Sequence, residues 1–118
     1  VKEFAAAYQA SYRAYRVQVE RGATLSKRQE LLSALVRRYE NKGIDLSTVR
    51  NEQERVKSDL AQVSSDFRIT LDFYKKTVAQ GADAAERVSL LERMLKKYQK
   101  TGIDLTEVRE ELNRLNKP

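Results

Sequence analysis

The sequence predicts an all-α protein built as two tandem copies of one helical unit. Three observations lead to this prediction. Residues that break helices are scarce, with four Gly among 118 residues and a single Pro at the last position. Apolar residues recur every three or four positions. The sequence also matches itself when it is shifted by 59 residues, which predicts repeats over 1–59 and 60–118, each a short three-helix bundle.

The internal match covers apolar residues and turn residues alike. It pairs Leu31 and Leu32 with Leu90 and Leu91, Tyr39 with Tyr98, Tyr15 with Tyr74, and Gly43-Ile44-Asp45-Leu46 with Gly102-Ile103-Asp104-Leu105. A fixed period that carries both core and turn positions is typical of linked or stacked structural units. We expect the chain to belong to a longer protein.

The first helix is expected over residues 2–21. Five apolar residues step along it by four, four, three and four positions and form one stripe: Phe4, Tyr8, Tyr12, Tyr15 and Val19. Gly22, like Gly81 in the second copy, is expected to end the helix, because Gly readily adopts the left-handed conformation found there.

The second helix is expected over 25–42, with Thr24 as its N-cap. In the second copy Asp83 takes that place, and Glu86 three residues later completes a capping-box pattern. The glycines at 43 and 102 should stop the helices that precede them. Asp45 and Asp104 should then cap the helices that follow.

The third helix is expected to run from 46 to 80 without interruption, across the junction between the copies, because no Gly or Pro lies inside it. A fourth helix is expected over 84–101 and a fifth over 105–116. This connectivity resembles that of spectrin-type repeats, in which the last helix of one unit runs into the first of the next. The resemblance is confined to connectivity, since these helices are much shorter and the chain has no Trp. The alternative is a solenoid of helical hairpins packed side by side.

The composition argues against several classes of function. The chain has no His and no Cys, so neither an imidazole base, a thiolate nucleophile nor the usual zinc ligands are available. Glu110 and Glu111 are adjacent and point in different directions on a helix. No apolar run approaches the roughly 20 residues that span a bilayer, and no signal peptide pattern is visible. We therefore expect no catalytic residue, no cofactor, no metal, no small-molecule substrate and no membrane insertion, while the compartment and oligomeric state stay open, the cytoplasm being weakly favoured.

The formal net charge of +6 admits nucleic acid or another polyanion as a partner. The candidate contacts are basic residues at matching places in the two copies: Arg37, Arg38, Arg50, Lys96, Lys97 and Arg109. The competing interpretation is a solvated surface whose charges favour helix C-termini. Tyr and Arg also alternate near Tyr12 and Arg13, a pattern that suits base stacking. Core packing explains it better, because Leu71 replaces Tyr12 in the second copy.

These observations favour a non-enzymatic structural or protein-interaction module, a rigid helical-repeat spacer or scaffold that docks a protein partner. The alternative is a basic helical module that binds nucleic acid or another polyanion without sequence specificity.

Overall fold

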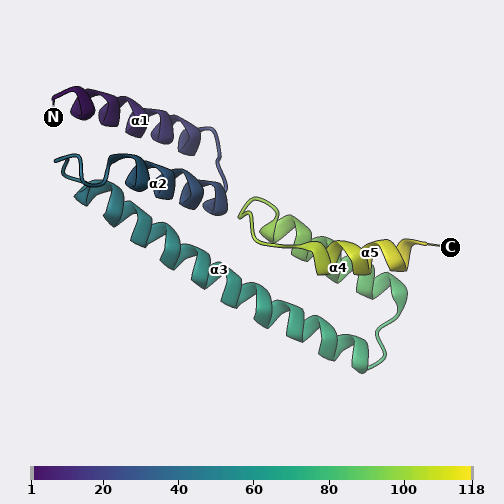
Figure 1. Cartoon of the computed structure of the whole chain (residues 1–118). Helices are drawn as coiled ribbons and strands as arrows, with labels where there is room; N and C mark the ends of the chain where they lie inside the picture. The colour runs from purple at the N-terminus through teal and green to yellow at the C-terminus, as the bar shows by residue number, and fades with distance from the viewer. Residues whose placement is uncertain (1, 118) are drawn as a thin grey trace. The chain divides into compact units, whose positions relative to one another are not determined.

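The computed structural model describes residues 2–117, and within them it contains five helices and no strand. The all-α prediction is therefore confirmed. The helices, labelled in Figure 1, are α1 (Lys2–Glu20), α2 (Leu25–Tyr39), α3 (Ser47–Ala79), α4 (Ala84–Tyr98) and α5 (Thr106–Asn116). The chain divides into two compact units, Val1–Leu60 and Ala61–Pro118, and α3 contributes residues to both.

The first unit packs α1, α2 and the first part of α3 around one apolar core. In Figure 1, α1 and α2 form an antiparallel hairpin, and α3 starts beside the end of α2. The buried core residues are Tyr15, Leu32, Leu35, Val36, Tyr39, Leu46, Val49 and Val56. Tyr8 and Tyr12 pack against this core while Arg13 and Arg16 are exposed, so the tyrosines of α1 serve core packing.

The second unit packs the last part of α3 with α4 and α5. Its buried core residues are Leu71, Tyr74, Leu91, Met94, Tyr98, Leu105 and Val108. Most of them lie 59 positions after a core residue of the first unit, as Tyr74 does after Tyr15 and Leu91 after Leu32. The two cores are thus built from corresponding sequence positions.

The second and fourth helices are shorter than expected. They end at Tyr39 and Tyr98, three residues before the predicted ends at 42 and 101. After Tyr39 the chain leaves the helix because Glu40 is extended and Asn41 has a left-handed φ of 64°. After Tyr98, the side-chain hydroxyl of Thr101 donates a hydrogen bond to the Tyr98 carbonyl. This hydrogen bond caps the C-terminal end of α4. The glycines at 43 and 102 close these turns rather than the helices, with φ of 73° and 85°.

Side-chain caps begin α2 and α4, whereas α5 has Leu105 at its N-cap and no side-chain cap hydrogen bond, so the predicted capping by Asp104 is wrong by one residue. Thr24 and Asp83 accept hydrogen bonds from the backbone amides of Lys27 and Glu86, at 3.0 and 2.8 Å, as the sequence predicted. Asp45 accepts from the amide of Ser47, two residues on, and Asp104 does the same for Thr106. The side-chain hydrogen bonds of Ser47 and Thr106, and then these backbone ones, lower the pKa of Asp45 and Asp104. Because each aspartate binds the amide two residues later, α3 and α5 begin one residue after the predicted starts at 46 and 105.

Candidate functional site: two buried polar networks

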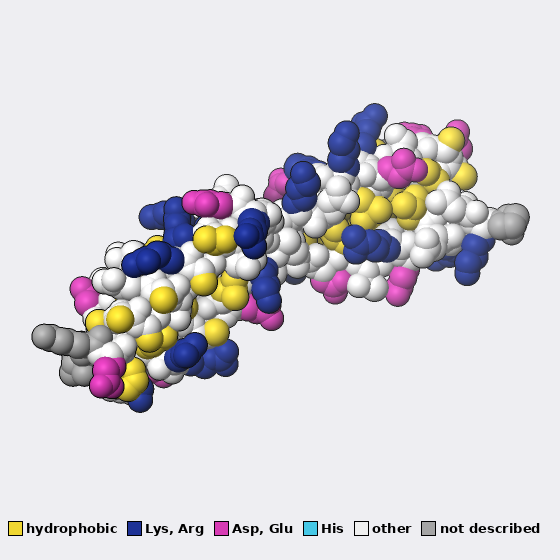
Figure 2. Space-filling model, turned by 90° about the horizontal axis from the view of Figure 1, so that it is seen from above, with side chains coloured by type: hydrophobic (Ala, Val, Ile, Leu, Met, Phe, Trp, Pro, Cys, Tyr) yellow, Lys and Arg dark blue, Asp and Glu magenta, His cyan; other side chains and the backbone are white. Residues whose placement is uncertain are grey.

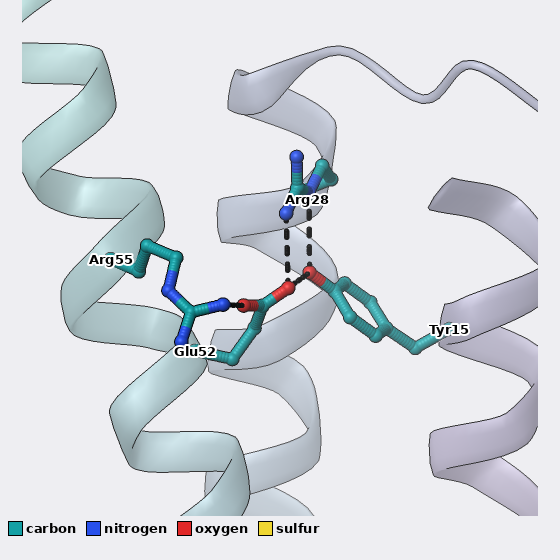
Figure 3. A network of polar contacts seen from close by, with 4 residues as sticks. All are labelled: Tyr15, Arg28, Glu52 and Arg55. Carbon is teal, nitrogen blue, oxygen red and sulfur yellow. Dashed lines mark hydrogen bonds and ion pairs between the residues drawn. The ribbon is translucent and has the colours of Figure 1, made fainter. Parts of the chain in front are cut away.

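A buried polar network joins the three helices of the first unit (Figure 3). Tyr15 of α1 donates its phenolic hydrogen to Oε2 of Glu52 in α3, at 2.9 Å. Arg28 of α2 donates from Nη2 to the same oxygen at 3.0 Å, and from Nε to the Tyr15 hydroxyl at 3.3 Å. Arg55 contacts the other carboxylate oxygen at 3.4 Å. One carboxylate therefore holds side chains from all three helices.

This network runs from the buried Glu52 to the surface, and an unpaired charge at Glu52 would be costly. The side chain of Glu52 is 7% exposed and that of Arg28 is 20% exposed. Burial raises the pKa of Tyr15. Burial would also raise the pKa of Glu52, but the hydrogen bonds from Tyr15 and Arg28 outweigh it and leave that pKa below its ordinary value. Glu52 is accordingly a carboxylate held in its charged form by its partners.

The second unit contains the same network 59 positions later. Tyr74 of α3 donates to Oε2 of Glu111 in α5 at 2.7 Å, and Arg87 of α4 donates to that oxygen at 2.9 Å. Arg87 Nε also donates to the Tyr74 hydroxyl at 3.4 Å. Arg114 forms an ion pair with Oε1 of Glu111, as Arg55 does with Glu52. All four residue types and all four contacts are repeated.

The chemistry of these networks is that of helix packing. Each carboxylate accepts from a tyrosine and is paired with two arginines, although Oε1 of Glu111 has the ion pair with Arg114 and no hydrogen bond among the described residues. The tyrosine hydroxyl both donates and accepts within the network. These contacts hold the helices of each unit together.

A second tyrosine contact also recurs. The hydroxyls of Ser11 and Tyr39 share a hydrogen bond of 3.0 Å in the first unit, and those of Thr70 and Tyr98 share one of 3.1 Å in the second. Tyr98 additionally donates to Asp66, and Lys97 forms an ion pair with Asp66 at 3.0 Å. Both contacts lower the pKa of Asp66, and the Asp66 hydrogen bond raises that of Lys97.

The predicted polyanion residues have different surroundings. Lys97 is engaged by Asp66, and the guanidinium of Arg38 lies 5.5 Å from the centre of the Tyr39 ring. The other four are exposed and have no side-chain partner within the described residues: Arg37, Arg50, Lys96 and Arg109. On the face shown in Figure 2, basic side chains are interspersed with acidic ones. Of the six predicted residues, two therefore contact other side chains, and four are available to bind a partner.

The predicted turn residues lie at the helix connections, and all four glycines have positive φ, including Gly22 at 90° and Gly81 at 96°. The sequence reasoning missed Arg28, Glu52 and Arg55, although it paired Tyr15 with Tyr74. A signal was present: each of these three is identical to the residue 59 positions later. Identical charged residues at matching positions, beside apolar helix faces, could have indicated buried ion pairs.

Within residues 2–117 no group of acidic, His or Cys side chains could hold a metal ion, and no helix has the length and apolarity to cross a membrane. Comparison with protein-family models, curated proteins and solved structures found no match to this chain. A functional proposal must therefore rest on the chain's own residues.

Proposed function

We propose that this chain is a non-enzymatic structural and protein-interaction module, a helical-repeat spacer or scaffold that belongs to a longer protein. It consists of two 59-residue repeats, each a short three-helix bundle, joined by one shared helix as in spectrin-type connectivity. The observation that carries the proposal is the polar network, which recurs with all four residue types and contacts: Tyr15, Arg28, Glu52 and Arg55, then Tyr74, Arg87, Glu111 and Arg114.

The buried network supports a structural role because breaking it carries a large free-energy penalty. Burying charges contributes little net stability, but removing one partner of a buried pair is strongly unfavourable. Such a network therefore penalises other packings of the three helices more than it stabilises this one. A scaffold needs helices that keep one arrangement, and the same solution in both units serves that need.

The shared helix supports a spacer mechanism. The 33 residues of α3 span about 50 Å at 1.5 Å per residue. Its middle section carries no Gly or Pro, and Leu60 and Val63 pack on the first and second cores respectively. A helix that joins two cores without a break in this way would set the spacing between the two units, and with it the spacing of the partners that they bind.

Spin-label distance measurements test the spacer. The chain has no native Cys, so labels can be placed at Glu30→Cys and Ser89→Cys, two exposed positions that correspond under the 59-residue shift. We expect a narrow distance distribution. The control replaces the exposed residues Gln62 and Ser64 by Gly, which weakens the helix between the units and should broaden the distribution. A parent distribution as broad as that of the diglycine variant would refute the spacer.

Polyanion binding is a second candidate, favoured by the four exposed basic residues without partners: Arg37, Arg50, Lys96 and Arg109. Fluorescence anisotropy with mixed-sequence DNA and RNA at about 50 and 200 mM salt tests it, because phosphate contacts weaken steeply with salt. Binding that is lost at the higher salt, and lost when these four residues become Gln, would support this candidate. Absence of binding at the lower salt would eliminate it.

A further inference from the structure

A shallow apolar groove lies between α3 and α4 in the second unit. It is lined by Thr70, Phe73, Tyr74, Leu90, Arg93, Met94 and Lys97, and its volume is about 190 Å³. Pockets that enclose drug-sized molecules usually hold 300–1,000 Å³. This groove is too small for such a ligand, but its size and mostly apolar lining suit side chains that project from a partner protein.

A large apolar side chain of α3, that of Phe73, lines this groove and is 61% exposed. Ile69, one turn earlier on the same helix face and next to the lining residue Thr70, is 67% exposed. The corresponding residues of the first unit are Ala10 and Ala14, and its groove between α1 and α2 is otherwise lined by matching positions. Since Ala suffices there, the fold does not require the larger side chains at 69 and 73. Their exposure points to an interaction surface.

The α4 side of the groove is basic. Arg93 and Lys97 stand one turn apart and line it, and no acidic residue does. Lys97 is paired with Asp66, whereas Arg93 has no ion pair within the described residues. The first unit has Ala34 where the second has Arg93, so this charge, like Phe73, distinguishes the two grooves.

We propose that the groove between α3 and α4 binds an amphipathic helix of a partner protein, with its apolar stripe on Phe73, Ile69 and Leu90 and acidic residues beside Arg93. An amphipathic helix lays apolar side chains at helical spacing into a groove between two helices. We assign acidic residues to the partner helix because they would complement the positive charge of Arg93 on the α4 side of the groove. This inference rests on the proposed interaction function, because it names the partner that the module docks.

The probe for this proposal is a labelled helical peptide of about 18 residues, with one Leu stripe flanked by Glu and the remaining positions Ala or Gln. We expect saturable binding by fluorescence anisotropy, with NMR shift changes centred on Phe73, Leu90 and Arg93. Replacing Ile69 and Phe73 by Ala, the residues of the first unit, should weaken binding at least about tenfold. Arg93→Glu should weaken it about as much, and should improve binding of a second peptide in which Lys replaces Glu.

The matched control is Ala34→Glu, which places the same charge at the corresponding position of the first unit and should leave binding unchanged. Circular dichroism of each variant establishes that it is folded. Absence of saturable binding, or equal binding of the Glu and Lys peptides, would overturn the proposal. So would a dimer, seen by sedimentation, that Phe73→Ala dissociates, because a second copy would then occupy the groove.

The peptide experiment and the spin-label experiment can fail separately. A narrow distance distribution without peptide binding would overturn the groove assignment alone. A broad distribution with peptide binding would overturn the spacer and leave the groove as the functional feature of the second unit.

Discussion

The two units keep one polar network but surround it differently. Tyr15–Glu52 and Tyr74–Glu111 distances are 2.9 and 2.7 Å, so the geometry is nearly the same. The Glu52 side chain is 7% exposed, however, and that of Glu111 is 15% exposed. In the first unit α3 continues past the network and buries Val56 completely, whereas Leu115, the corresponding residue near the end of α5, is only half-buried. The length of the third helix beyond the network therefore explains why Glu52 is less exposed to solvent than Glu111.

The apolar neighbours differ as well. In the first unit Tyr12 stacks with Tyr8 and Tyr15, at ring-centre distances of 6.4 and 5.9 Å. In the second unit Leu71 takes the place of Tyr12, and it lines a cavity of about 440 Å³ together with Tyr74 and Glu111. Hydrogen bonds between charged groups tolerate little change in geometry, but an apolar core accepts residues of different size. Polar contacts thus define the unit, and apolar residues vary within it.

The largest effect is expected from removing the buried carboxylate. Glu52→Ala leaves Arg28 and the Tyr15 hydroxyl without their acceptor, and should lower the free energy of unfolding of the first unit by about 3 kcal/mol. Urea denaturation followed by circular dichroism measures this. Glu111→Ala should cost less because Glu111 is more exposed and its partners can reach water. An equal loss of unfolding free energy in the two variants would show that the difference in solvent exposure between Glu52 and Glu111 has no energetic consequence.

A smaller effect is expected from exchanging the apolar neighbours. Tyr12→Leu removes two stacked aromatic pairs, and should cost about 1–2 kcal/mol of unfolding free energy. The reverse change, Leu71→Tyr, places a ring beside an existing cavity and should not lower the melting temperature. Thermal melts of both variants check this. If Leu71→Tyr destabilises as strongly as Tyr12→Leu, the two cores are more similar than their residues indicate.

The turns after α2 and α4 provide a third comparison. Asn41 has a positive φ, so Asn41→Val should cost about 1 kcal/mol, because a β-branched residue is strained in the left-handed region. Lys100 occupies the corresponding place without a positive φ, and Lys100→Val should be nearly neutral. Urea midpoints distinguish the two variants. A neutral Asn41→Val would mean that this turn adopts another conformation in solution.

The smallest effect concerns pH. The pKa of Glu52 lies below its ordinary value of 4.5, so its contribution to stability is complete above about pH 4.5 and is lost as the pH falls through the folded-state pKa. The melting temperature should therefore fall more steeply between pH 5 and 3 in the parent than in Glu52→Gln, whose side chain does not titrate. Parallel pH profiles would show that Glu52 does not contribute to acid unfolding.

Much of the helix pattern was predictable because its signals are local. Gly and Pro usage, the apolar stripes and the caps at Thr24 and Asp83 each involve residues within one or two turns. Gly43 and Gly102 predict helix ends at 42 and 101, but α2 and α4 end three residues earlier, at Tyr39 and Tyr98. The chain leaves the helix earlier because Asn41 adopts a left-handed conformation in one turn and Thr101 bonds back to Tyr98 in the other.

The polar networks and the groove were not predicted. Arg28 and Glu52 are 24 positions apart, and a charged residue on a helix is ordinarily solvated. Only the comparison of the two copies distinguishes Glu52, which matches Glu111, from the exposed Glu54, which corresponds to Asn113. Phe73 corresponds to Ala14, outside the apolar stripe of the first helix, and only the packing of α3 against α4 shows that Phe73 lines a groove.

The all-α class and, to within three residues, the bounds of the helices in residues 2–117 follow from the sequence, because helix formation depends on residues close together along the chain. The tertiary structure alone decided which charges are buried as pairs and which apolar side chains stay exposed. Those outcomes depend on residues that are distant in sequence and meet only when helices pack, as Tyr15, Arg28 and Glu52 do.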